Sequence, residues 1–268
     1  MSSKEKELEL ICTNEETFES ILANLEKIDE TRLEALVSLR EKLKFNSDKV
    51  DIVIAPPMVY LSDTLNKVSL SEVSVAAQNT FYEHNGPYTG EVSVDMLKDI
   101  GCTWVMIGHS ERRQHLLETN EMINKKVLLA TQNGLKVICC LGETYEERRQ
   151  GKTFSKILDQ LKRALREVDE KHLSNIVIGY EPIWVIGSGK AAELKDIKEA
   201  HDFISEELKN MYPKSKQLPR IVYGGSVDSN NIVEIINLDN VDGVLVGSAS
   251  LDCEKFCDIV IKTEYSND

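Results

Sequence analysis

The chain has 268 residues, of which 41 % are apolar and 29 % are charged, and it carries a formal net charge of −13. This length fits one large α/β domain or two small ones, and the apolar content is that of ordinary globular proteins. The acidic balance argues against nucleic acids and anionic membrane surfaces as partners, so an anionic ligand would need locally placed donors.

The N-terminal residues 1–18 are rich in acidic side chains and lysine. We expect a loosely held arm there, followed by one folded domain over residues 19–268. The start of the chain lacks the apolar run of a signal peptide, and no stretch approaches the ~18 apolar residues of a spanning helix. The six cysteines form no CxxC pair, so buried free thiols fit better than zinc or a disulfide. These features predict a cytoplasmic protein.

Short apolar runs alternate with longer amphipathic ones along the rest of the chain. Eight short runs are typical of strands buried on both faces: 20–24, 51–55, 73–78, 104–108, 136–140, 175–180, 220–223 and 241–246. Helices are expected between them, for example over 30–44 and, most clearly, 154–168. Eight such units without a linker predict a single closed (β/α)8 barrel. An open doubly wound sheet is the alternative, but the glycine fingerprint usual after its first strand is absent.

The stretch that follows the sixth predicted strand carries the clearest chemistry. Glu181 stands where the strand ends, and Pro182 stops the strand because it has no N–H to donate. The next residues are apolar and then reach Gly187-Ser188-Gly189, a composition typical of a lid that closes over a site. We call residues 182–190 the lid segment. Glu181 at its base is a candidate general base, and a helix-capping glutamate is the alternative interpretation.

His109 follows the fourth predicted strand and opens a short polar segment. Positive partial charge at a helix N-terminus disfavours a second positive charge, so this imidazole should stay neutral and donate a hydrogen bond. The other four histidines, among them His115, fall in predicted loops or helices and are interpreted as structural or solvated.

Two glycine motifs follow the last two predicted strands. They are Tyr223-Gly224-Gly225-Ser226 and Val246-Gly247-Ser248. Glycines let the backbone approach a ligand, and a helix that starts after Gly247 would direct free N–H groups at an anion. A phosphate site after strands seven and eight recurs in barrels of this type.

Over roughly residues 20 to 262 the chain resembles the triosephosphate isomerase family. The matching stretches are 88–93, 107–113, 142–143, 180–190, 223–227 and 242–247. The resemblance implies a homodimer in which residues 79–91 enter the partner. It also implies the interconversion of dihydroxyacetone phosphate and glyceraldehyde 3-phosphate, a step of glycolysis and gluconeogenesis, without cofactor or metal.

The resemblance also implies roles for single residues. Glu181 would move the proton between two carbons, neutral His109 would polarise the carbonyl and stabilise the enediolate, and Glu111 would support them. The substrate-binding positions that it implies are Asn24, Gly187, Ser226, Gly247 and Ser248. Position 248 is often glycine in the family, but serine still offers its N–H.

One motif of the family is missing. The family carries Asn-x-Lys at the end of the first strand, and the lysine binds the substrate phosphate. Matching from 55–57 backwards puts the asparagine on Asn24 and the lysine position on Glu26, with Lys27 the nearest cation. An alternative register makes 8–14 the first strand, but Asn14 is then followed by Glu15 and Glu16.

Two hypotheses therefore stay open. One is a working isomerase that uses another cation or tolerates the loss of the lysine. The other is an impaired or inactive barrel that serves as a phosphometabolite-binding or scaffold protein. The motifs that would supply the base, the electrophile, the lid and the phosphate loops favour a working isomerase. Glu26 favours an impaired or inactive barrel.

Overall fold

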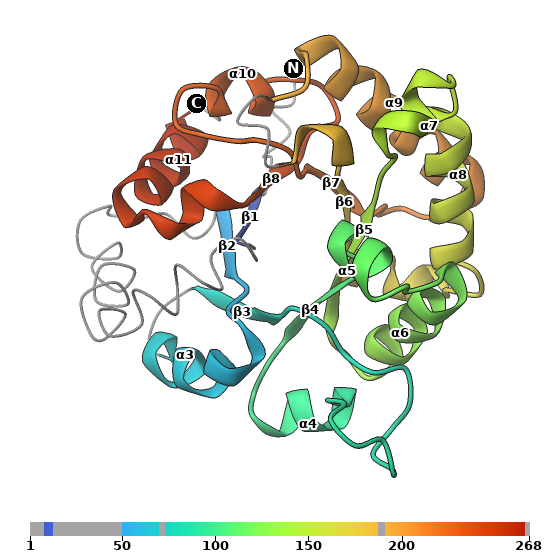
Figure 1. Ribbon diagram of the computed structural model, residues 1–268, viewed down its shortest axis with the longest axis vertical. Helices are drawn as coiled ribbons and strands as arrows, with labels where there is room; N and C mark the ends of the chain where they lie inside the picture. The colour runs from blue at the N-terminus through green and yellow to red at the C-terminus, as the bar shows by residue number, and fades with distance from the viewer. Residues whose placement is uncertain (1–7, 13–49, 70–72, 187–190, 266–268) are drawn as a thin grey trace.

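The computed structural model describes residues 8–12, 50–69, 73–186 and 191–265. In these residues eight parallel strands form a closed barrel in which each strand neighbours the next and β1 pairs with both β2 and β8 (Figure 1). The strands are β1 (Leu8–Cys12), β2 (Val50–Ile54), β3 (Ser74–Ala77), β4 (Trp104–Ile107), β5 (Lys136–Leu141), β6 (Ile176–Tyr180), β7 (Arg220–Tyr223) and β8 (Gly243–Val246). The predicted (β/α)8 barrel is confirmed.

Helices surround the barrel on the outside (Figure 1). The α-helices are α3 (Leu61–Val68), α4 (Val94–Asp99), α5 (Ser110–His115), α6 (Asn120–Gln132), α7 (Tyr145–Arg149), α8 (Thr153–Ala164), α9 (Leu194–Met211), α10 (Ile232–Ile236) and α11 (Cys253–Tyr265). Short 3-10 helices are η1 (Met58–Tyr60), η2 (Glu170–Asn175), η3 (Ile183–Val185) and η4 (Ser248–Leu251). Within the described residues, no helix is long and apolar enough to cross a membrane.

The position of the first strand differs from the register that the sequence favoured. Strand β1 is Leu8–Cys12, and Leu10 pairs with Ile52 of β2 and with Val244 of β8. This register was the less favoured alternative from the sequence because it leaves a long connection to β2, but the entropy of closing a loop rises only slowly with its length. Five residues of the predicted N-terminal arm therefore belong to the barrel. The predicted strand 20–24 and the predicted helix 30–44 lie outside the described residues.

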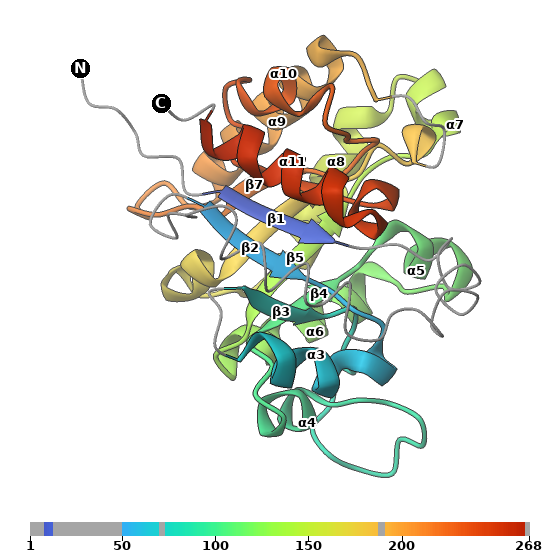
Figure 2. The ribbon, with the colours of Figure 1, turned by 90° about the vertical axis from the view of Figure 1, so that its left-hand side faces the viewer.

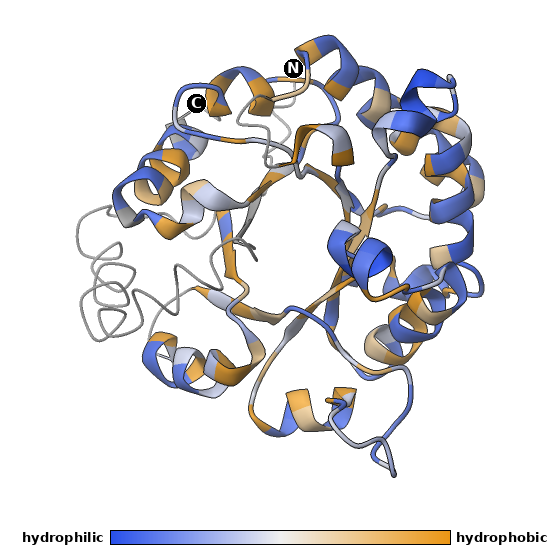
Figure 3. Cartoon of the chain, viewed as in Figure 1, coloured by the Kyte–Doolittle hydropathy of each residue, from blue (hydrophilic) through white to orange (hydrophobic). Residues whose placement is uncertain are grey.

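The core has two layers because side chains along a strand alternate between its faces. Among the side chains that the structure describes, ten buried ones form a separate cluster in the barrel interior, including Val53, Trp104, Cys140 and Leu245. The larger cluster lies between the strands and the helices and includes Cys139. Figure 3 shows the same arrangement, with apolar strands and with helices whose hydrophilic colour lies mainly on the outside. The adjacent thiols Cys139 and Cys140 are thus buried on opposite faces of β5.

All eight strands run in the same direction, so their carboxyl ends meet at one end of the barrel. Figure 2 shows α5 at the end toward which the arrows of β1 and β2 point. The connections that leave the strands at this end carry Glu181, His109 and the two glycine motifs.

Candidate active site

Glu181 is the first residue after β6 and is only 2 % exposed. Its backbone N–H donates to the carbonyl oxygen of Leu141 at the end of β5 (2.8 Å). One carboxylate oxygen accepts a hydrogen bond from the backbone N–H of Ser110 (3.0 Å), and the other lies 3.2 Å from Nε2 of His109. The carboxylate is therefore held between the β6 exit and the start of α5.

Two glycines make room for Glu181. A Cβ at Gly142 would lie 1.8 Å from the carbonyl oxygen of Glu181, a distance at which the backbone would have to move. A Cβ at Gly224 would lie 3.0 Å from Cγ of Glu181. Position 142 needs glycine because the backbone of the glutamate passes close to it, and at position 224 the glutamate side chain would have to shift slightly to admit a Cβ.

His109 is the N-cap residue of α5, directly after β4, and its side chain is 14 % exposed. Its Nδ1 lies 3.4 Å from a carboxylate oxygen of Glu111, and its Nε2 faces Glu181. A neutral imidazole carries one N–H, so it donates to one partner at a time. The histidine that the sequence singled out thus lies between two carboxylates, with one ring nitrogen directed at the candidate base.

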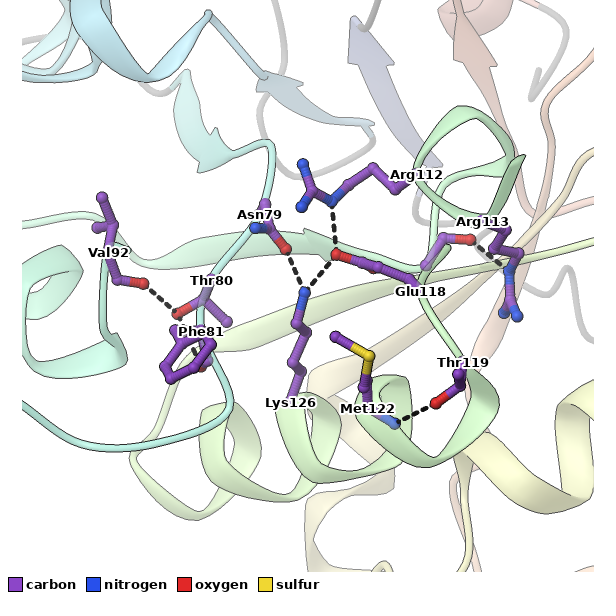
Figure 4. Close-up of polar contacts among 11 residues, drawn as sticks. Asn79, Thr80, Phe81, Val92, Arg112, Arg113, Glu118, Thr119, Met122 and Lys126 are labelled. Carbon is purple, nitrogen blue, oxygen red and sulfur yellow. Dashed lines mark hydrogen bonds and ion pairs between the residues drawn. The ribbon is translucent and has the colours of Figure 1, made fainter. Parts of the chain in front are cut away.

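A group of charged residues, in which Glu118 and Lys126 are buried, lies beside α5 (Figure 4). Glu118, just after α5, accepts from Nε of Arg112 (2.7 Å) and from Nζ of Lys126, which also donates to Asn79 after β3 (2.7 Å). Burial lowers the pKa of Lys126 below its ordinary value. Because the lysine joins α6 to the residues that follow α5 and β3, it fixes the helix that carries His109.

A cavity of about 270 Å³ opens at the carboxyl ends of the strands. Its lining includes the predicted residues His109, Glu111, Glu181, Ser226, Gly247 and Ser248. The two glycine motifs therefore meet the Glu181–His109 pair, as the sequence predicted. A 3-10 turn, η4, follows Gly247 in place of the helix expected there, and Ser250 closes this turn by donating to the carbonyl oxygen of Gly247 (2.6 Å).

The family model described as "Triosephosphate isomerase" matches residues 20–263. The chain belongs to the triosephosphate isomerase family. The matched segment begins after β1, at the position where the sequence argument had placed the first strand.

Curated relatives give the same result. A protein named triosephosphate isomerase from Caldanaerobacter subterraneus subsp. tengcongensis is 43 % identical over 242 residues, which cover 90 % of this chain and 98 % of the relative. Relatives of the same name from Thermoanaerobacter sp. (strain X514) and Lawsonia intracellularis are 44 % and 43 % identical. They cover 90 % and 87 % of this chain, and 98 % and 94 % of their own lengths.

Several positions implied by the triosephosphate isomerase resemblance lie outside the described residues. They are Asn24, Glu26 and Lys27 near the expected first strand, and Gly187 in the lid segment. Of the lid segment, the structure describes residues 182–186. Ile183 and Ile186 from this part line the cavity, and the carbonyl oxygen of Val185 accepts from Oγ of Ser226 (2.9 Å).

His115 was interpreted as structural or solvated, and it is an exposed residue at the end of α5. It also lines the cavity together with Gln114. Its signal in the sequence was its position six residues after His109, near two helical turns along the same short helix. The support of the lid segment was not predicted from the sequence.

Glu143 follows β5 and anchors the start of the lid segment. Its carboxylate is fully buried and accepts from Nε1 of Trp184 (3.0 Å) and from the hydroxyl of Tyr180 (3.3 Å). Burial raises the pKa of Glu143 above its ordinary value. Farther along the chain, the N–H of Ala192 donates to the hydroxyl of Tyr223 (3.1 Å). Buried polar atoms of the barrel thus hold residues on both sides of 187–190.

Proposed function

We propose that this chain interconverts dihydroxyacetone phosphate and glyceraldehyde 3-phosphate. The observation that supports this most directly is the contact of the Glu181 carboxylate with Nε2 of His109 (3.2 Å), in a cavity also lined by Ser226, Gly247 and Ser248. This places one proton acceptor, one hydrogen-bond donor and two glycine-rich turns around a space of small-molecule size.

In the proposed reaction, Glu181 takes a proton from the carbon beside the carbonyl group. The electrons of that C–H bond move toward the carbonyl oxygen and give an enediolate, which a hydrogen bond from His109 stabilises. The hydroxyl proton on the first carbon passes to the former carbonyl oxygen, and the Glu181 carboxylic acid returns its proton to the neighbouring carbon. The oxygen on the first carbon then becomes the new carbonyl oxygen, and Glu181 is a carboxylate again. Glu111 supports His109 from the other ring nitrogen.

The phosphate of the substrate is proposed to bind at the two glycine motifs. Gly247 and Ser248 follow β8, Ser226 follows β7, and Gly187 would add its N–H from the lid segment. Backbone N–H groups suit a phosphate in a protein of net charge −13, because they attract the anion without a cationic side chain. Asn24 is proposed as a further substrate contact.

The decisive experiment is a coupled assay of the purified chain with glyceraldehyde 3-phosphate. We expect turnover that survives dialysis against a metal chelator, because the proposed steps use side chains alone. Absence of turnover, together with retained binding of a phosphorylated inhibitor, would favour the alternative of an inactive phosphometabolite-binding barrel.

We propose further that the chain is a cytoplasmic homodimer. The support is the family's dimeric arrangement together with residues 79–91, which the structure describes as a long connection between β3 and α4. Tyr88 in this connection is 41 % exposed, an aromatic surface of the kind that partner subunits cover. Light scattering on the purified chain should give a mass near twice that of the 30.2 kDa monomer.

A further inference from the structure

Arg148 lies outside the active-site cavity but contacts three side chains in or next to the lid segment. It belongs to α7, and its guanidinium lies 4.3 Å from the ring centre of Trp184. One nitrogen is 2.6 Å from a carboxylate oxygen of Asp196, and another is 3.7 Å from Oε1 of Glu143. A single side chain therefore reaches residues that lie before and after the lid segment in the chain, and one within it.

At the start of the lid segment, both Arg148 and Glu143 contact the indole of Trp184. Glu143 accepts from the indole N–H, while the guanidinium covers the ring face. Trp184 is the third residue after Glu181, and Ile183 between them donates its N–H to the carbonyl oxygen of Glu143 (3.1 Å). Any displacement of the indole is therefore passed through a short, hydrogen-bonded stretch to the backbone of Glu181.

On the far side, Arg148 is paired with the first turn of α9. Asp196 is an acidic residue of that turn, and α9 begins four residues after 187–190. The position of Arg148 is itself fixed, because α7 starts with a capping box between Thr144 and Glu147. The planar guanidinium suits this place because it stacks with its face while donating at its edges, which an ammonium group does not reproduce.

We propose that Arg148 is a positioning residue for catalysis. It connects Trp184, near the start of the lid segment, to Asp196, beyond its end, and so keeps Glu181 in place for proton transfer. This inference rests on the proposed function and extends it to a residue that does not touch the cavity.

The kinetic test compares three variants in the isomerase assay. Arg148→Ala removes both the stacking and the ion pair, and we expect kcat/KM to fall by about tenfold, chiefly through kcat, because Arg148 does not line the cavity. Arg148→Lys keeps a charge near Asp196 but loses the flat face, so it should recover only part of the loss. The control is Arg149→Ala in the same helix, since Arg149 is 64 % exposed and contacts Glu146 and the ring of Tyr145, both in α7. Its kinetics should match the parent.

A spectroscopic test is independent of turnover. The chain has two tryptophans, and Trp104 is buried in the barrel interior, so quenching of fluorescence by acrylamide reports mainly on Trp184. Arg148→Ala should raise the quenching constant, and Arg149→Ala should leave it unchanged. Thermal unfolding of each variant checks that it is folded, and Arg148→Lys carries the test if the alanine variant does not fold.

The outcomes are distinct. A folded Arg148→Ala variant with unchanged kcat and unchanged quenching would overturn the proposal, as would a loss that appears only in KM. If the parent chain shows no isomerase activity, the proposed function fails, and the quenching result alone then decides whether Arg148 orders Trp184.

Discussion

The carboxylate of Glu181 has two hydrogen-bonding neighbours, and a substrate would compete with them for contact with the carboxylate oxygens. The backbone N–H of Ser110 and Nε2 of His109 lie at 3.0 and 3.2 Å from its two oxygens. The side chain is only 2 % exposed, so the site combines a solvent-poor carboxylate with two fixed neighbours.

Replacing Glu181 by glutamine tests whether this carboxylate is the base. Glutamine keeps the shape and an oxygen for the N–H of Ser110 but does not accept a proton at neutral pH. We expect turnover to fall by about 10²–10⁴-fold, the usual contribution of a general base. Steady-state kinetics measure this loss, and an unchanged melting temperature shows that the fold is intact. Near-parent turnover would mean that another group takes the proton.

His201 in α9 predicts how stability depends on pH. The ring is fully buried, its Nδ1 lies 2.9 Å from the carbonyl oxygen of Asn240, and burial lowers its pKa to about 4. The unfolded chain binds a proton here below pH ~6.5, whereas the folded chain does so only near pH 4. This histidine therefore costs stability as the pH falls through that window, by about 3 kcal/mol in total.

Urea unfolding of the parent and of His201→Asn at pH 7.5 and 4.5 checks this expectation. Asparagine keeps a donor near the position of Nδ1 but does not titrate. The variant should lose less stability between the two pH values than the parent does. Equal losses would show that His201 does not contribute to the acid sensitivity.

At the scale of elements, Tyr223 joins the end of β7 to Ala192, the residue directly before the N-cap of α9. Its buried hydroxyl accepts from the N–H of Ala192. Tyr223→Phe leaves that buried N–H without its partner, which typically costs about 1–3 kcal/mol. If this energy holds the far end of the lid segment in its working position, kcat/KM should fall by roughly 5- to 100-fold. Unchanged kinetics would separate this hydrogen bond from catalysis.

The sequence predicted the pair Glu181 and His109 because each stands at a strand end inside a contiguous motif. It did not predict the support around Trp184, since Glu143 and Arg148 stand close together after β5, whereas Trp184 follows β6 and Asp196 belongs to α9. Each of the three charged residues looks ordinary by itself. Only the closed barrel brings the β5 exit, α7 and α9 together around one indole.

At the scale of the whole molecule, seven strands were predicted to within about two residues because strands buried on both faces read as continuous apolar runs. Leu8–Cys12 escaped this prediction because its glutamate and its acidic surroundings mask a short apolar pattern. The local pattern favours a strand only weakly, and pairing with β2 and β8 stabilises the segment as a strand, since strand preference depends strongly on neighbours.

The two registers of the first strand put different residues at the position of the family's phosphate-binding lysine. The position is Glu26 if the asparagine is Asn24, and Glu16 if it is Asn14. We predict that Glu26→Lys raises kcat/KM by about 10- to 100-fold, because a charge-assisted bond to the phosphate is worth about 1.5–3 kcal/mol.

Glu16→Lys is the matched variant for the other register. A gain there, without a gain at position 26, would assign the lysine position to the residues that follow β1. If the parent runs at a normal rate for the family and neither substitution raises it, the interpretation of a missing lysine is wrong.

The reactivity of the two adjacent thiols of β5 would report which part of this barrel unfolds first. Burial raises the pKa of Cys139 to about 11 and that of Cys140 well above its ordinary value, so neither should react with an alkylating reagent in the folded state. Cys139 becomes reachable when helices detach from the outside of the strands, whereas Cys140 requires the ring of strands itself to part. The order in which mass spectrometry detects the two labels would therefore tell whether unfolding begins with the outer helices or with the ring of strands.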